Sequence, residues 1–171
     1  MQAPCYTRHM TGSNTPAPET PEGRAALQLA AWIAVVRTYN ECTATLLARL
    51  APLGVTLLQH EVMMNLLRSP GLTQRALAER CFSAKSGVSM LLDRMQQDGL
   101  VTRDPHPDDS RARIIHLTEA GKRLARELAQ MQAEVVEEMT SPYDTAELET
   151  LERLMDETAE RLRQMREDLR R

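Results

Sequence analysis

Residues 72–118 constrain the fold of this chain most, because chain breakers and hydrophobic spacing there predict a definite order of elements. Thr73 is a good helix N-cap residue, so a short helix is expected to begin there. A turn at residues 82–83 leads to a second helix over residues 84–97. The buried stripe of this second helix, at helical spacing, is Val88, Leu91, Leu92 and Met95. Gly99 ends it, because glycine readily takes the left-handed conformation that most helix C-termini require.

The face of the second helix opposite the apolar stripe must be exposed. It carries Lys85, Ser86, Ser89, Met90 and Arg94. Two runs with β propensity follow, at residues 100–102 and 114–117, and the eleven residues between them contain two prolines, three aspartates and three arginines. The arginines are Arg103, Arg111 and Arg113. A polar hairpin with arginine at its tip and base is a wing, so the predicted fold is mainly α, a winged helix-turn-helix with a small β-hairpin.

These segments resemble the MarR family of bacterial transcriptional regulators. The matching segments are LAER (77–80), SGVSMLLDRM (86–95), DGLV (98–101), DDSRARIIHLT (108–118) and EAGK (119–122). The most specific is the D-x-R of Asp109 and Arg111, followed by a β run and L-T-x-x-G. The resemblance extends from about residue 24 to the end of the sequence. It implies a DNA-binding transcriptional regulator, and we expect a ligand-responsive repressor that binds a pseudo-palindromic operator in double-stranded DNA.

The rest of the chain predicts a tail and dimerisation helices around the winged domain. Residues 1–22 hold four of the nine prolines and are expected to be a disordered tail, in which Met10 is an alternative start. Residues 23–53 contain a long helix, residues 55–118 the DNA-binding domain and residues 119–171 two more helices. Thr56 with Gln59, and Thr118, are expected N-terminal caps. Pro142 is expected at the first position of the last helix.

The first and last helices carry more apolar surface than one domain covers. The first helix is apolar around much of its circumference from residue 27 to 36. The last helix has a seam of period near 3.5, formed by Leu148, Leu151, Met155, Leu162, Met165 and Leu169. We therefore expect a homodimer with two-fold symmetry, which places two reading helices on two DNA half-sites.

Charge and composition agree with this assignment. The net charge of −3 argues against DNA binding when taken alone. However, residues 55–118 hold eight Arg or Lys against seven Asp or Glu, while residues 119–171 hold nine against fourteen, so the middle can present a local basic surface. No apolar run reaches the ~18 residues of a membrane span, and no signal peptide is seen. We expect no membrane association and a cytoplasmic protein, located at the nucleoid when bound to DNA.

Several residues are expected to contact DNA. Lys85, Ser86 and Ser89 lie where recognition helices meet base edges, although the same face is also typical of an ordinary solvated helix. The resemblance implies that Arg111 enters the minor groove and that Asp109 supports the wing. The remaining candidates are Met90, Arg94, Arg103 and Arg113. Of these, Arg94 and Arg103 are equally compatible with pairing inside the domain.

Two departures from the family pattern affect the second helix. Ala84 stands where relatives usually have a capping serine, with Ser83 one place earlier, so the cap is expected to be shifted or weak. Met90 stands where an arginine is common, which removes a phosphate or base contact. The operator sequence and the regulated genes therefore do not follow from the resemblance.

The regulating signal is left open between three alternatives. The resemblance implies a small aromatic or phenolic effector between the dimerisation helices and the winged domain. Residues placed to line that cleft are Trp32, Arg37, His60, Met63 and Met64, which also suit a plain core. Cys42 is the candidate for redox sensing, while Cys5 lies in the tail and Cys81 resembles core. The histidines show no metal-ligand spacing, so neither a metal nor a cofactor is expected.

Two other classes of protein were weighed against a DNA-binding regulator. The sequence has no glycine-rich phosphate loop, nucleophile elbow or paired acid site, so we do not expect an enzyme. A dimeric scaffold whose winged domain binds a protein, and no DNA, has the same predicted fold. Binding to DNA is what separates the scaffold from the regulator.

Overall fold

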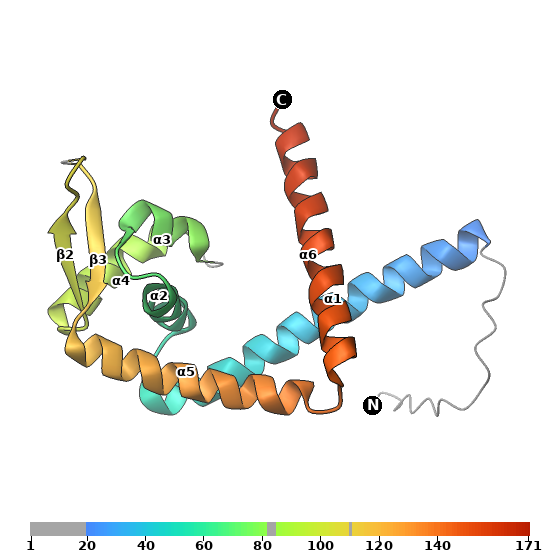
Figure 1. Cartoon of the computed structure of the whole chain (residues 1–171), viewed down its shortest axis with the longest axis horizontal. Coiled ribbons are helices and arrows are strands. Elements are labelled where there is room, and N and C mark those ends of the chain that lie inside the picture. The colour runs from blue at the N-terminus through green and yellow to red at the C-terminus, as the bar shows by residue number, and fades with distance from the viewer. Residues whose placement is uncertain (1–19, 82–84, 110) are drawn as a thin grey trace, which may run out of the picture. The chain divides into compact units, whose positions relative to one another are not determined.

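The computed structural model describes residues 20–81, 85–109 and 111–171 (Figure 1). The chain divides into two compact units after Cys42, within the first helix. The first unit is the larger part of helix α1 (Pro21–Leu50). Most of the predicted tail lies outside the described residues, but Pro21 and Glu22 are helical, so the predicted boundary at residue 22 was wrong by two positions.

The second unit follows the predicted order of elements. It contains the end of α1 and then η1 (Ala51–Leu53), α2 (Leu57–Arg68), β1 (Leu72–Thr73), α3 (Gln74–Arg80), α4 (Lys85–Gln97), β2 (Val101–Pro105), β3 (Arg113–Leu117), α5 (Glu119–Thr140) and α6 (Thr145–Asp168). This is the winged helix-turn-helix followed by two helices. The predicted turn at residues 82–83 and the cap at Ala84 lie outside the described residues.

Side chains cap the helices as the sequence predicts at three of four positions. The hydroxyl oxygens of Thr56, Thr73 and Thr118 each accept a hydrogen bond from a backbone N–H of the helix that follows. The fourth prediction was wrong, because α6 begins at Thr145 and Pro142 lies before it. Asp144 caps α6 instead, in a reciprocal capping box with Glu147 that satisfies two otherwise unpaired N–H groups.

The sheet has three antiparallel strands in the order β1-β3-β2, and the sequence predicted only two of them. The strand that was missed, β1, is two residues long and pairs Leu72 with Ile115. β2 begins at Val101 and runs to Pro105, so it starts one residue later and ends three residues later than predicted. The extra residues are held by cross-strand pairing, with Arg103 opposite Ile115. Gly99, with φ of 68°, makes the left-handed turn between α4 and β2.

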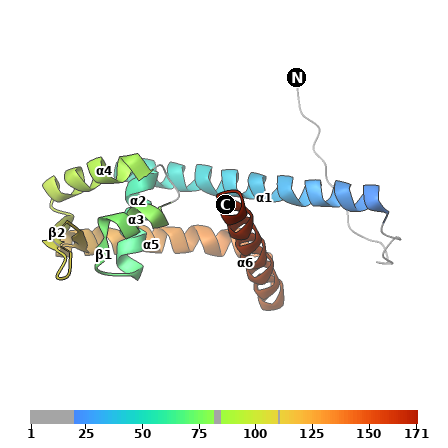
Figure 2. The ribbon, with the colours of Figure 1, turned by 90° about the horizontal axis from the view of Figure 1, so that it is seen from above.

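The core of the second unit joins α2, α3, α4, the sheet and α5. Its fully buried side chains include Met63, Leu77, Val88, Leu92, Met95, Val101, Ile115 and Leu128. In both views α5 begins at the end of β3 and crosses next to α2, on which it packs (Figures 1 and 2). The described residues of α6 contribute no buried side chain. The recognition elements are therefore fixed on a packed base, while α6 keeps its apolar seam uncovered within one protomer.

Both dimerisation candidates expose large apolar side chains. Those of α1 in the first unit are Leu27, Leu29, Trp32, Ile33, Val35, Val36 and Tyr39. Those of α6 and its C-cap are Leu151, Leu154, Met155, Leu162, Met165 and Leu169. Among the described residues, no single helix is long and apolar enough to cross a membrane; one bent pair, α1 with η1 and then α2, reaches the required length and composition together.

Candidate nucleic-acid interface

Helix α4 has one buried and one exposed face, as its sequence predicts. Val88, Leu92 and Met95 are buried in the core. Ser89 and Met90 lie on the opposite side, with Met90 74% exposed. Because this methionine is uncovered at the middle of the helix, the described residues of the second unit leave this face open. Such a helix is free to enter a major groove.

The other residues of α4 that were expected to contact DNA are Arg94, Lys85 and Ser86. The Arg94 side chain is 81% exposed and lies 3.8 Å from Asp98, so its ion pair is long and open to solvent. Such pairs contribute little, about 0 to 1 kcal/mol, and leave the guanidinium available. Lys85 and Ser86 are the first two residues of α4, and their side chains lie outside the described part of the structure.

The wing is shaped at its tip by Asp109. Its carboxylate Oδ1 accepts the backbone N–H of Arg111 at 2.9 Å, and its backbone carbonyl accepts the N–H of Ala112 at 3.0 Å. The predicted supporting role of Asp109 thus takes the form of an internal hydrogen bond. Arg111 and Arg113 are both exposed, and neither forms an ion pair with another described residue. The wing therefore presents two arginine side chains that form no ion pair with the described carboxylates.

Arg103 takes the second of the two roles open to it, which is pairing inside the domain. Its guanidinium lies 2.7 Å from the Asp93 carboxylate of α4 and donates to the carbonyl of Ser89 at 3.4 Å. The side chain is only 19% exposed. Arg103 therefore joins β2 to α4, so that the wing and the recognition helix are held together by a charge-assisted contact.

A groove of about 540 Å³ lies between the start of α3 and the wing. Its lining residues are Thr73, Gln74, Arg75, Ala78, His106, Asp109, Arg111, Ala112 and Arg113. Arg75 was not singled out in the sequence. Its pair with Glu79 spans one helical turn, and its side chain is 90% exposed. The pairing of β1 with β3, which brings α3 to the wing, joins segments far apart in the sequence. The only sequence signal for a role of Arg75 was therefore its position in the first helical turn after Thr73.

The residues predicted to line an effector cleft are distributed over both units. Trp32 and Arg37 lie on α1 in the first unit, where Trp32 is 63% exposed. His60, Met63 and Met64 are buried in α2 of the second unit. Burial lowers the pKa of His60, with a further lowering from Arg68 and an opposing effect from Glu61. The imidazole Nε2 of His60 has no hydrogen-bond partner among the described residues.

The cysteines differ in accessibility. Cys81 is buried, and burial, aided by nearby Glu61, raises the pKa of its thiol to about 11. Cys42 is half-buried, and Cys5 lies outside the described residues. Since the thiolate is the reactive form, Cys81 is poorly suited to sense oxidants and Cys42 is the better candidate.

We expect iodoacetamide at pH 7.5 to alkylate Cys42 at least tenfold faster than Cys81 in a Cys5→Ser variant. The raised pKa lowers the thiolate fraction of Cys81 about a hundredfold or more relative to an unperturbed thiol, and burial slows access further. Peptide mass spectrometry over a time course measures both rates. Equal rates would contradict the assignment of Cys81 to the core.

Comparison with known proteins gives matches to one family. A family model described as MarR family matches residues 53–112, the segment from η1 to the wing. The crystal structure of AbsC, a MarR family transcriptional regulator from Streptomyces coelicolor, superposes with a TM-score of 0.71 at 26% identity, covering 85% of this chain and 97% of that chain. The chain is therefore similar to MarR-family proteins in its winged helix-turn-helix segment.

Other matches differ in extent. Wild-type apo MarR from Escherichia coli gives a TM-score of 0.61 at 25% identity, covering 76% of this chain and 96% of that chain. The transcriptional regulator HosA from Escherichia coli O111:H- is 38% identical over 66 residues, which are 39% of this chain and 49% of HosA. The chain thus spans about half the length of the first curated relatives that it matches.

Proposed function

We propose that this protein is a MarR-family DNA-binding transcriptional regulator rather than an enzyme, and that it acts as a homodimer on a pseudo-palindromic operator. The observation that carries the proposal is the exposed face of α4 beside a wing whose two exposed arginines, Arg111 and Arg113, form no ion pair with the described residues. One α4 enters the major groove of each half-site, and one wing reaches the flanking minor groove. Binding occludes the promoter, so the expected effect is repression.

The homodimer is supported by the apolar side chains that α1 and α6 leave uncovered. Soluble proteins rarely leave so many large apolar side chains exposed along one helix. A second copy of the chain covers them most simply, because a two-fold axis pairs each face with its equivalent. The same axis sets the two α4 helices about one turn of DNA apart.

Arg75 adds a phosphate contact to this proposal. Together with Arg111 and Arg113 it surrounds the groove between α3 and the wing, where Asp109 is the one carboxylate among the lining residues. A groove with this charge balance suits the phosphate backbone between the major groove and the wing's minor groove. Contacts of this kind fix register and add to the salt dependence of binding, but they do not read sequence.

Arg111→Ala is expected to weaken operator binding by about 1 to 3 kcal/mol per subunit and to lower the salt slope by about one per subunit. The reason is that Arg111 has no ion pair within the described chain, so its charge is available to the minor groove. Fluorescence anisotropy with a labelled operator at several salt concentrations measures both quantities. Arg171→Ala removes the same charge at the far C-terminus and serves as the control, and equal affinities for the two variants would refute the wing's role.

Mobility shift with the promoter region beside the protein's own gene tests the function itself. A regulator shows tight, salt-dependent binding with preference for one near-palindrome over bulk DNA. A protein-binding scaffold of the same fold shows no such preference, and that result would refute the proposal.

We also propose that a small aromatic or phenolic effector loosens DNA binding. Support comes from the large apolar side chains that α1 exposes in the first unit, among them Trp32. A thermal-shift screen of phenols and aromatic acids tests this, because a ligand that binds the folded state raises the melting temperature. Reversible oxidation at Cys42 is the alternative signal, and its test is loss of DNA binding after peroxide in the wild type but not in Cys42→Ser.

A further inference from the structure

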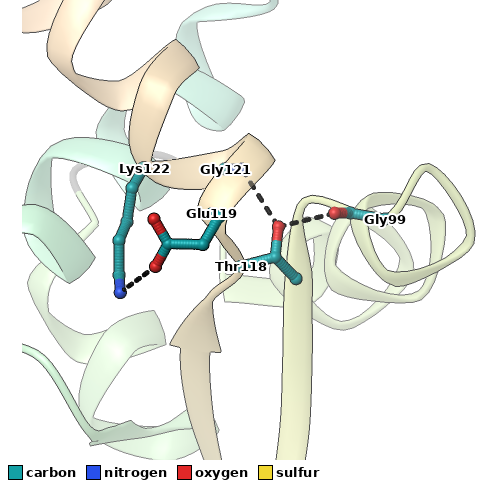
Figure 3. Close-up of polar contacts among 5 residues, drawn as sticks. All are labelled: Gly99, Thr118, Glu119, Gly121 and Lys122. Carbon is teal, nitrogen blue, oxygen red and sulfur yellow. Dashed lines mark hydrogen bonds and ion pairs between the residues drawn. The ribbon is translucent and has the colours of Figure 1, made fainter.

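One threonine joins the dimerisation helix α5 to the turn that ends the recognition helix α4 (Figure 3). The Thr118 hydroxyl accepts the N–H of Gly121 at 3.0 Å, which caps α5. The same hydroxyl donates to the carbonyl of Gly99 at 2.6 Å. The backbone N–H of Thr118 donates to the carbonyl of Leu100 at 3.0 Å. Thr118 is therefore hydrogen-bonded both to α5 and to the turn. A helix cap requires only the bond to Gly121, so the bonds to Gly99 and Leu100 are additional.

Gly121 brings the backbones of the two elements into direct contact. A Cβ added at Gly121 would lie 2.0 Å from the carbonyl oxygen of Leu100 and 3.0 Å from its carbonyl carbon. No side chain therefore separates the first turn of α5 from Leu100. A backbone-to-backbone contact has little freedom to adjust, whereas contacts between side chains relax by rotamer changes.

The turn at Gly99 and Leu100 is also hydrogen-bonded to α4. The N–H of Leu100 donates to the carbonyl of Met95 at 2.8 Å, and the N–H of Gly99 donates to the carbonyl of Gln96 at 3.1 Å. Met95 is buried in the core of the winged domain. A continuous set of short hydrogen bonds thus leads from the end of α4 through Gly99 and Leu100 to the start of α5.

The geometry of this joint matters because α5 is long. Its 22 residues span about 33 Å at about 1.5 Å per residue. A rotation of about 6° at the joint displaces the far end by about 3.4 Å, the rise of one base pair. Side chains of α5 also pack on α2, so the joint and this packing together set the direction of the helix.

From these contacts we propose that Thr118 and Gly121 are positioning residues that set the angle between α4 and α5, and so determine which half-site spacing the dimer accepts. This inference rests on the proposed function, since it concerns a dimer on two half-sites. The joint consists of contacts within the chain and needs no bound ligand. Thr118 acts on DNA only through the placement of α4.

Thr118→Asp separates the joint from the helix cap. Aspartate is a good N-cap, as Asp144 of this chain demonstrates by accepting the N–H of Glu147 at 2.9 Å. An ionised carboxylate has no proton to donate to Gly99, so the bond across the joint is lost. Thr118→Ser retains both bonds. Thr56→Asp is the matched control, because Thr56 caps α2 through Gln59 and the same charge is added at a cap with no bond across a joint.

The test is a panel of operators whose half-sites are separated by the preferred spacing and by one or two base pairs more or fewer. Wild type, Thr118→Ser and Thr56→Asp are expected to prefer one spacing at least tenfold over its neighbours. Thr118→Asp is expected to lose at least threefold of that preference, while its affinity for an isolated half-site changes less than twofold. Sedimentation velocity and circular dichroism check that each variant remains a folded dimer.

A distance measurement on the free protein tests whether Thr118 sets the placement of α4 in the absence of DNA. Spin labels on Gln97→Cys, with Cys5 and Cys42 replaced by serine, report the distance between the two α4 ends in the free dimer. The distance distribution is expected to be broader in Thr118→Asp than in wild type. If the aspartate variant does not fold, Thr118→Ala takes its place in both measurements with Thr56→Ala as its control, because both alanine variants lose a helix cap and only Thr118→Ala also loses the bond to Gly99.

The outcomes separate the two proposals. Equal loss of affinity for every duplex, with spacing preference and label distances unchanged, overturns the inference and leaves the regulator assignment intact. Absence of wild-type binding to any operator overturns the proposed function, and the inference about half-site spacing with it.

Discussion

Leu151→Lys is expected to convert the dimer into monomers at micromolar concentration and to abolish operator binding. Leu151 lies on the apolar seam of α6 and is 47% exposed in one protomer. Losing a buried leucine costs about 2 kcal/mol. Two-fold symmetry repeats the loss, so the total is about 4 kcal/mol, or roughly a thousandfold in the dimer dissociation constant. Burial of an unpaired lysine adds to this penalty.

Sedimentation velocity measures the state of association, and anisotropy with operator DNA measures binding. Thr150→Lys is the matched control, because it adds the same charge at the adjacent exposed position outside the seam. It should remain a dimer and retain operator binding. An intact dimer in Leu151→Lys would show that the seam lies elsewhere on the chain.

Gly121→Ala is expected to destabilise the folded protein by about 3 kcal/mol or more, which lowers the melting temperature by about 10 °C. In an open helix the same change stabilises by up to about 1 kcal/mol. Here the new methyl group would lie 2.0 Å from the carbonyl oxygen of Leu100, and a backbone atom cannot move away by itself. The helix must shift, which breaks the bonds of Thr118 described above.

Gly87→Ala provides the comparison. Gly87 and Gly121 are each the third residue of their helix. A methyl group at Gly87 would lie 3.2 Å from Leu58 Cδ2, the end of a flexible side chain that rotates away. The free energy of unfolding of this variant should lie within about 1 kcal/mol of the wild-type value. Differential scanning calorimetry on both proteins is the measurement, and equal melting temperatures would contradict the direct backbone contact.

Local sequence signals predicted most of the fold. Thr73 and Thr118 as caps, Gly99 as a helix end and the spacing of Val88, Leu92 and Met95 all depend on neighbours within one or two helical turns. These features were confirmed. The chain order of helix, turn, helix and hairpin follows from them.

What the sequence did not predict depends on residues far apart in the chain. Strand β1 is two residues long and exists because it pairs with β3, more than forty positions later. The partner of Arg103 is ten positions earlier, so its ion pair with Asp93 was one of two alternatives. The reason for glycine at position 121 is visible only once Leu100 lies against it.

The capping of α6 was a local signal that was read wrongly. Asp144 and Glu147 have the spacing of a capping box, but the preference of Pro142 for a first helical position was given more weight. For the candidate site, the sequence predicted which faces of α4 and the wing are polar. It did not reveal that Arg75 lies across a groove from Arg111, because strand pairing creates that groove.

The charges of α5 are divided along its length. Lys122, Arg123 and Arg126 lie in its first two turns, where Lys122 forms an ion pair with Glu119, whereas Glu134, Glu137 and Glu138 lie toward its other end. The helix dipole favours acidic residues at the start and basic residues at the end, so Glu119 agrees with it and the other charges oppose it. At physiological salt, charges are screened over about 8 Å, so the ends of a helix about 33 Å long do not neutralise each other. A polyanion therefore meets a more favourable potential at the start of α5, next to β3, than at the far end of the helix.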